Sequence, residues 1–201
     1  MTATKTMILT FTWTLLTLFA CTTNSLQTVQ TEPPNLDTVY SVTTKQLHSD
    51  KIPDSVFQMT NLRRLDISGQ DCDTRRYDDK GNNITDCWMI TELPPAIGNL
   101  RELTTLRLTL NAIKKIPKEI AQLKQLKLLD LTDNAGLEDM DNLARVQSLE
   151  RLLLYGCNLT KLPDNIGDLK NLKELGLVGN NLDKAEQKRI RKALPNCNVI
   201  F

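Results

Sequence analysis

Few side chains in this sequence have the types and spacing that catalysis requires. The only histidine is His48, and no serine, cysteine or carboxylate set accompanies it in the pattern of a nucleophilic site. The sequence also has no glycine-rich loop that would hold a phosphate and no placed pair of carboxylates. We therefore expect a protein that is not an enzyme and that needs no cofactor.

The five cysteines are the most reactive groups, and their positions suggest different roles. A bond between Cys72 and Cys87 would close a loop of 16 residues, which stabilises a fold by about 3 kcal/mol in an oxidising compartment. The alternative is two separate thiols, with Cys72 filling a place in the core. Cys157 and Cys197 are expected two strands apart in the sheet proposed below, about 10 Å, too far for a disulfide.

Aspartates gather around the Cys72–Cys87 segment, and carboxylates are the ligands that Ca²⁺ prefers. These residues are Asp71, Asp73, Asp78, Asp79 and Asp86. Their spacing matches no EF-hand loop, so we favour a solvated acidic hairpin, with a Ca²⁺-dependent surface as the alternative. Zinc is not expected, because the sequence has no C-x-x-C motif and no histidine cluster. We predict no metal site.

The amino terminus has the composition of an export signal. Met7–Ala20 is apolar but too short to span a membrane. It ends in LFAC at 18–21, which resembles a bacterial lipobox and implies cleavage before Cys21 and lipid attachment to its thiol. We expect a signal peptide at 1–20, then the lipidated cysteine and a disordered tether at 21–37, in a lipoprotein of the cell envelope, outer membrane or cell surface. An ordinary secretory signal and a secreted protein are the alternative.

The composition argues against a nucleic-acid partner. The net charge is +1, with 25 basic and 24 acidic residues, and aromatic residues make up 4% of the chain. Proteins that bind nucleic acids carry a basic surface, and those that bind single strands stack bases on aromatic rings. Neither feature is present.

Leucines in the rest of the chain recur at a fixed interval. Leu103, Leu126, Leu149 and Leu172 begin segments 23 residues apart, each close to L-x-x-L-x-L-x-x-N/C-x-L, with x-x-L-P-x-x-I-x-x-L following in the regular copies. This pattern resembles the leucine-rich repeat family. One repeat cannot bury its own apolar face, so the repeats must stack. The resemblance implies an α/β solenoid of about six repeats with a parallel concave sheet, an irregular, 3-10 or short helical convex side, and a C-terminal cap strand.

The repeat domain is expected at 38–201, with an insertion at about 73–89 in the repeat that begins at Leu62. Counting backwards along the 23-residue spacing gives a degenerate first repeat, with Val39, Val42 and Thr44 at positions 1, 4 and 6. In the repeat that begins at Leu126, Leu137 and Met140 come one place late.

The C-terminal repeat changes character. Lys184–Ala193 is rich in helix formers and is preceded by Asp183 as a candidate N-cap, with Glu186 as a capping-box partner. Pro195 would end this helix. The residues expected to face inwards are Ala185, Ile190, Ala193 and Leu194. Leu194, Cys197 and Val199 are expected at positions 1, 4 and 6 of a last strand.

Two sets of polar or exposed positions follow from the repeat numbering. Position 9 requires a side chain that bonds backbone groups where the chain leaves the strand, and it holds Asn111, Asn134, Cys157 and Asn180, to which we assign a structural role. Position 5, on the open face, would hold Thr43, Asp66, Arg107, Asp130, Leu153 and Gly176.

In proteins that this chain resembles, partners usually dock on the concave face. The resemblance therefore implies a protein partner there, bound by Arg64, Asp66, Arg107, Thr109, Leu110, Leu128, Asp130, Arg151, Leu153 and Tyr155. Exposed apolar residues beside arginine and tyrosine suit the centre of an interface. The alternatives are strand residues that an open sheet tolerates, and an envelope spacer with no dedicated ligand. We expect a monomer.

Overall fold

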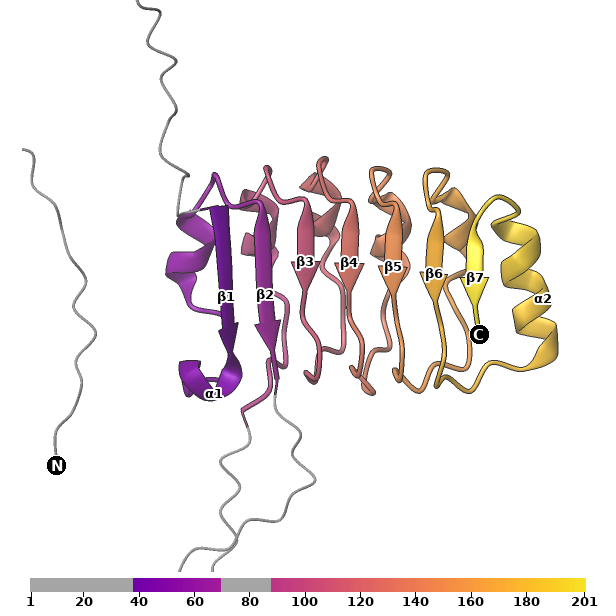
Figure 1. Ribbon diagram of the computed structural model, residues 1–201, viewed down its shortest axis with the longest axis horizontal. Coiled ribbons are helices and arrows are strands. Elements are labelled where there is room, and N and C mark those ends of the chain that lie inside the picture. Colours follow the sequence, from indigo (N-terminus) through magenta and orange to yellow (C-terminus); the bar gives the residue numbers. More distant parts are fainter. Residues whose placement is uncertain (1–37, 70–87) are drawn as a thin grey trace, which may run out of the picture. The chain divides into compact units, whose positions relative to one another are not determined.

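The computed structural model describes residues 38–69 and 88–201, which form one solenoid (Figure 1). A sheet of seven parallel strands follows the order of the chain. The strands are β1 (Val39–Thr43), β2 (Arg64–Ser68), β3 (Thr105–Arg107), β4 (Leu128–Asp130), β5 (Arg151–Leu153), β6 (Glu174–Gly176) and β7 (Asn198–Ile200). α1 (Thr44–Leu47) stands at the carboxyl end of β1, and α2 (Lys184–Ala193) forms the C-terminal end of the solenoid beside β7. Behind the sheet lie five 3-10 helices, at Asp54–Gln58, Pro95–Asn99, Lys118–Gln122, Asp141–Arg145 and Asp164–Asp168.

The core lies between the sheet and the row of 3-10 helices. Side chains at positions 4 and 6 of the middle repeats are buried, such as Leu152 on β5 and Leu154 directly after it, whereas those of β1 and β7 are half-buried. The return limbs add residues such as Ile120 and Ile166 from the 3-10 helices. Each buried leucine or isoleucine contributes about 1.5–3 kcal/mol, so the stack is stabilised by the sum of many similar contacts.

Proline sets where most of the 3-10 helices begin. Four of the five follow a proline directly, at Pro53, Pro94, Pro117 and Pro163. Proline fixes φ and has no N–H to donate, so it starts a short helix without allowing one to run through it. The exception follows Met140, in the repeat whose apolar residues come one place late.

In the first repeat, the predicted strand register is wrong by two residues. Tyr40 pairs with Leu65 and Val42 with Ile67, so Tyr40 and Val42, rather than Val42 and Thr44, hold positions 4 and 6. Thr44 instead begins α1, where its buried hydroxyl donates to the Trp88 carbonyl oxygen. The count was wrong because the α1 turn lengthens the connection between the first strand and the first 3-10 helix.

In the last strand, β7, the predicted register is also wrong by two residues. Val199 pairs with Leu175 and therefore holds position 4, not position 6, and Cys197 lies before the strand. The bounds of α2 match the predicted helix, and the Asp183 side chain accepts from the Glu186 N–H. Ala185 is nevertheless exposed and Glu186 is buried, the reverse of the prediction. A true α-helix replaces the 3-10 turn of the other repeats, which shifts the strand that follows.

Several predictions concern residues outside the described ranges: the signal peptide, Cys21 and the tether, the Cys72–Cys87 bond and the aspartates around it. Within the described ranges, Ile90 fills position 11 of its repeat. It is fully buried, and its N–H donates to Oδ1 of Asn111 at 2.8 Å. No helix in the described part of the chain is long and apolar enough to cross a membrane.

Candidate binding surface on the concave sheet

Asparagines hold the chain where it leaves β3, β4 and β6. Oδ1 of Asn134 accepts from the Ile113 N–H at 3.1 Å, and its Nδ2 donates to the carbonyl oxygens of Leu108 and Leu131, both at 2.8 Å. Asn111 and Asn180 make the corresponding bonds in their own repeats. Each carboxamide thus joins its own strand exit to the preceding repeat, which fixes the edge of the concave surface.

Cys157 occupies the same position with a weaker donor. Its thiol donates to the carbonyl oxygens of Leu131 at 3.2 Å and Tyr155 at 3.4 Å. Burial raises the pKa of this thiol to about 11, so the group stays protonated. A thiol cannot reproduce the second amide donor or the carboxamide oxygen. The preceding repeat is the irregular one, and there the Leu137 N–H bonds the Asn134 carbonyl oxygen instead.

The concave face of the sheet is open in the described structure, because the 3-10 helices lie behind it, while α1 stands at the carboxyl end of β1 and α2 at the C-terminal end of the solenoid (Figure 1). One side chain per strand points outwards at position 5. From β1 to β7 these are Ser41, Asp66, Arg107, Asp130, Leu153, Gly176 and Ile200. Ser41 thus replaces the predicted Thr43, a consequence of the corrected register. The row is polar over β1–β4 and becomes apolar over β5–β7.

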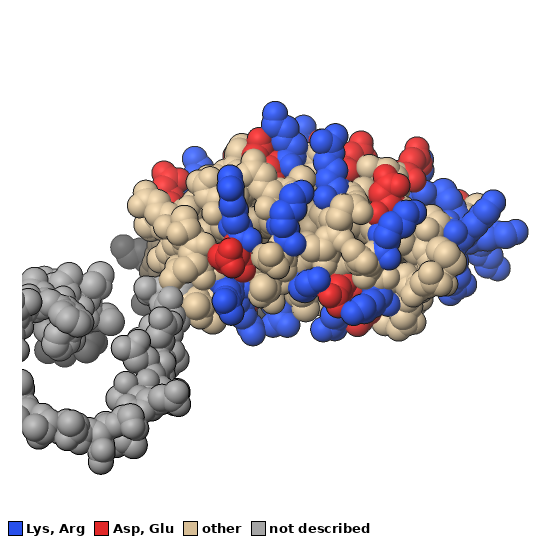
Figure 2. Space-filling model, turned by 90° about the horizontal axis from the view of Figure 1, so that it is seen from above, with Lys and Arg blue, Asp and Glu red and all other residues tan. Residues whose placement is uncertain are grey.

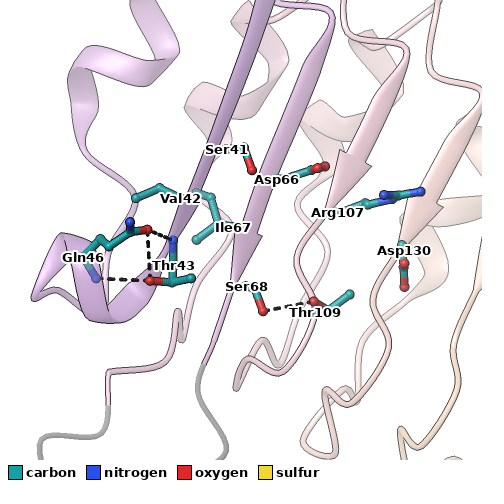
Figure 3. A pocket seen from close by; sticks show the side chains of 10 residues that line it. All are labelled: Ser41, Val42, Thr43, Gln46, Asp66, Ile67, Ser68, Arg107, Thr109 and Asp130. Atoms are coloured by element: carbon teal, nitrogen blue, oxygen red, sulfur yellow. Dashed lines mark hydrogen bonds between the residues drawn. The ribbon is translucent and has the colours of Figure 1, made fainter.

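A polar pocket of about 370 Å³ lies over β1–β4. It is lined by Ser41, Val42, Thr43, Gln46, Asp66, Ile67, Ser68, Arg107, Thr109 and Asp130. Figure 3 shows Asp66, Arg107 and Asp130 following one another on β2, β3 and β4. The N-terminal cap therefore contributes to the pocket through α1 and β1, whose lining residues the sequence analysis had not selected.

Two polar atoms of this pocket lack a partner among the described residues. Oδ2 of Asp66 accepts from Arg64, with Nε at 2.8 Å, while Oδ1 is buried without a hydrogen bond. Nε of Arg107 is likewise buried without a hydrogen bond. Oδ1 of Asp130 accepts from the Thr132 hydroxyl at 2.7 Å. Buried polar groups are normally hydrogen-bonded, so one acceptor and one donor remain unpaired in the wall of this pocket.

The surface over β5–β7 is apolar. Leu153 and Tyr155 are half-buried, while Val178 is 48% exposed and Ile200 37% exposed. A Cβ at Gly176 would lie 2.3 Å from Cζ of Tyr155. The absence of a side chain at Gly176 therefore leaves room for the Tyr155 ring to pack on β6. The sequence analysis missed Val178 and Ile200. Val178 occupies position 7 with Tyr155 and was available from the repeat numbering, whereas Ile200 required the corrected register of β7.

Ion pairs border the apolar surface. Arg151 and Glu174 face each other on β5 and β6, with Nε to Oε2 at 3.0 Å and Nη2 to Oε1 at 3.2 Å. Glu150 pairs with Lys127 at 3.0 Å and with Lys173 at 2.6 Å. Hydrogen bonds from Lys173 and Lys127 lower the pKa of Glu150, and the hydrogen bond to Glu174 raises the pKa of Arg151. These charges lie at the amino-terminal ends of β4–β6, along one edge of the apolar surface, as part of the polar rim of an interface does.

Leu110 stands at the edge of the concave face in an unusual conformation. Its φ is 55°, in the left-handed region, and its side chain is 36% exposed. Asp133, Gly156 and Gly179 hold the same position in later repeats, also with positive φ. Aspartate and glycine tolerate this region, whereas a leucine there is an outlier. Such outliers cluster at functional sites.

The predicted binding residues thus fall into separate groups on one face. Asp66, Arg107, Thr109 and Asp130 line the polar pocket. Leu153 and Tyr155 lie in the apolar surface. The rest are Arg64, paired with Asp66, Arg151, paired with Glu174, Leu128 on β4 and Leu110 at the edge.

The described residues contain no group of three His, Cys, Asp or Glu side chains that would hold a metal ion. Cys157 and Cys197 are both free thiols. Burial raises the pKa of Cys197 to about 11 as well.

Comparisons with known proteins agree on one kind of architecture. A family model described as a leucine-rich repeat region matches residues 83–200. A leucine-rich repeat protein of Leptospira interrogans has a TM-score of 0.62 and 34% identity, over 75% of this chain and 34% of its own. The leucine-rich repeat domain of the type III effector XopL has a TM-score of 0.52 and 24% identity, over 75% of this chain and 56% of its own. This chain therefore spans about a third of the length of the Leptospira protein and somewhat over half the length of the XopL domain. No curated protein matches it.

Proposed function

The chain belongs to the leucine-rich repeat family, and we propose from this that it is a non-catalytic module that binds a protein partner on its concave sheet. Proteins of this family are typically binding modules without enzymatic activity. Their scaffold keeps one face of the sheet in the core and leaves the other open to a partner.

The observation that carries the proposal is the uncovered apolar surface over β5–β7. Val178 and Ile200 are each more than a third exposed, and Leu153 and Tyr155 lie beside them. A solenoid gains no stability from such exposure. Contiguous exposed apolar side chains with a polar rim are typical of interaction sites.

The polar pocket supports the same proposal by a different kind of contact. Its lining side chains Asp66, Arg107 and Asp130 would pair with polar groups of a partner. The apolar surface would then contribute most of the binding energy, and the pocket would select among partners, because a wrong partner leaves these polar groups desolvated and unpaired.

Photocrosslinking from defined positions tests this surface. The full chain would carry benzoylphenylalanine at Thr109, at Val178 or, as a control, at Lys118 on the opposite side of the solenoid. We expect one adduct of defined mass from Thr109 and Val178 and none from Lys118. Gly176→Ala, which displaces the Tyr155 ring, should reduce the adduct from Val178. Equal adducts from both sides would contradict the proposal, and no adduct from any position would favour an envelope spacer.

We also propose that the chain is exported and held in the cell envelope, at the outer membrane or on the cell surface, by a lipid on Cys21. The support is the apolar leader that ends in LFAC at 18–21. Membrane fractionation of wild type and Cys21→Ser, with mass measurement of the N-terminal peptide, tests it. An acylated peptide in the membrane fraction, lost in the variant, is expected. A soluble wild type without lipid mass would contradict the anchor and leave a secreted protein.

A further inference from the structure

The outer face of α2 carries a stripe of cations. Lys184, Lys188, Arg191 and Lys192 are all exposed and occupy positions i, i+4, i+7 and i+8, which share one face of a helix. None of the four forms an ion pair with another described residue. Figure 2 shows Lys and Arg side chains gathered at the end of the solenoid that α2 forms.

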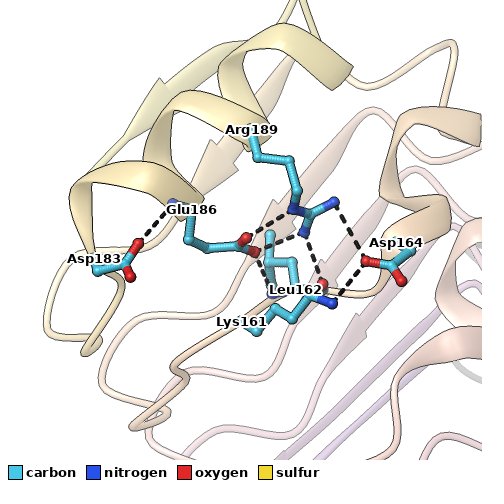
Figure 4. Close-up of polar contacts among 6 residues, drawn as sticks. All are labelled: Lys161, Leu162, Asp164, Asp183, Glu186 and Arg189. Atoms are coloured by element: carbon cyan, nitrogen blue, oxygen red, sulfur yellow. Dashed lines mark hydrogen bonds and ion pairs between the residues drawn. The ribbon is translucent and has the colours of Figure 1, made fainter.

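The inner face of α2 is fixed to the solenoid, so the stripe points outwards. Ile190 is fully buried, and the Glu186 carboxylate accepts from the Leu162 N–H at 2.8 Å (Figure 4). Arg189 pairs with Glu186 at 2.6 Å and donates to the Leu162 carbonyl oxygen at 2.8 Å. The only acidic side chain of the helix is therefore neutralised internally, and the outward charge is entirely positive.

Stability of the helix does not account for this stripe. Cations near a helix C-terminus are favourable, which explains Arg191 and Lys192, but a cation in the first turn opposes the helix dipole, and Lys184 is the first residue. Solubility does not account for it either, since a cap needs a polar surface but not one of a single sign. The N-terminal cap also has a polar surface, but its exposed charges are of both signs, from Lys45, Asp50 and Lys51.

We propose that the outer face of α2 docks on an anionic phospholipid surface. The helix is about 15 Å long, and its four cations form an exposed row along it, in which the Arg191 guanidinium also lies 4.8 Å from the ring centroid of Phe201. A row of this kind can reach the headgroups of a flat membrane together. A folded acidic protein would need a complementary shape around it. The only exposed apolar side chain of α2 is the small Ala185, so binding is electrostatic and superficial.

Vesicle sedimentation with the full chain tests this proposal, using phosphatidylglycerol mixed with phosphatidylcholine against pure phosphatidylcholine. The test variant is Lys184→Gln/Lys188→Gln/Lys192→Gln. The matched control removes three exposed lysines elsewhere, Lys114→Gln/Lys115→Gln/Lys118→Gln. Melting temperatures of both variants check the fold. Any contribution of the N-terminal leader is the same in all three proteins.

Wild type and control should bind the anionic vesicles, and binding should weaken with salt as the Debye length falls from about 10 Å at 0.1 M to about 3 Å at 1 M. Each cation removed should weaken binding about fivefold, and the triple variant on the order of 100-fold. Equal binding to both lipids, or a triple variant that binds like wild type, would overturn the proposal. Binding to immobilised polyglutamate without binding to anionic vesicles would also overturn it, and would assign the stripe to an acidic protein.

Discussion

Leu152 and Leu153 are neighbours of the same type with opposite surroundings. Leu152 is fully buried under β5, while Leu153 faces the open concave side. β2 to β5 all show this alternation, so the buried face carries the stability of the solenoid and the concave face is free to vary. Because consecutive strand residues point to opposite faces, the role of a leucine here depends on its place in the repeat and not on its chemistry. Substitutions on the two faces should therefore have separable effects.

The sharpest test introduces the same charge at these two neighbours. Leu152→Asp places a carboxylate in the core and should lower the free energy of unfolding by more than about 4 kcal/mol, so that the central repeats lose their structure. Leu153→Asp should change it by less than about 1 kcal/mol while removing the photocrosslinked adduct at Val178. Urea unfolding followed by circular dichroism measures both. Wild-type stability of Leu152→Asp would mean that the two faces are wrongly assigned.

A second test compares two residues of position 9 on the buried edge. Asn134→Ala leaves the Ile113 N–H and the Leu108 carbonyl oxygen without this partner, removes one of the two side-chain donors to the Leu131 carbonyl oxygen and should cost about 3 kcal/mol. Cys157→Ala removes one weak donor and should cost about 1 kcal/mol. Similar losses in the two variants, measured by the same urea titration, would show that the thiol replaces the carboxamide fully.

The buried charge of the C-terminal cap extends the comparison to pH. The hydrogen bond from Arg189 lowers the pKa of Glu186 below its ordinary value of 4.5. A lowered pKa in the folded state stabilises above the unfolded pKa, and this stabilisation is lost as pH falls through the folded value.

Glu186→Gln should therefore cost about 1–2 kcal/mol at neutral pH and unfold with a weaker pH dependence below about pH 4.5. Melting temperature as a function of pH measures this effect. The exposed Glu138→Gln serves as a control that should leave the profile unchanged. Parallel profiles for wild type and Glu186→Gln would contradict the role of this carboxylate.

The smallest effect has the opposite sign. Leu110→Asn places a residue that tolerates positive φ where a leucine is strained, and Leu110 does not belong to the core cluster. The variant should gain about 0.5–1 kcal/mol and yet weaken partner capture, because an exposed apolar contact is lost. Thermal unfolding tests the gain in stability, and the yield of the crosslink from Thr109 tests the loss of partner capture. A loss of stability would show that Leu110 supports the fold.

The repeat pattern was sufficient to predict most of the architecture. It predicted the parallel sheet, the buried leucines, the position of the asparagine ladder, the irregular repeat around Leu137 and the bounds of α2. The register of both terminal strands was predicted wrongly, because α1 and α2 change the length of the connections that the count assumed constant. Glu186 was missed as a buried residue, since its partner at Leu162 lies in the preceding repeat.

Local periodicity encodes which residues are buried, because the alternation of a strand and the spacing of a turn repeat along the chain. The contacts between side chains on the open face depend instead on the tertiary structure. The pocket between Asp66, Arg107 and Asp130, the seat of the Tyr155 ring on Gly176, and the joining of Val178 and Ile200 into one surface depend on which repeats stack side by side and how their side chains pack. Those contacts join residues about 20 or more positions apart, and only the folded stack brings them together.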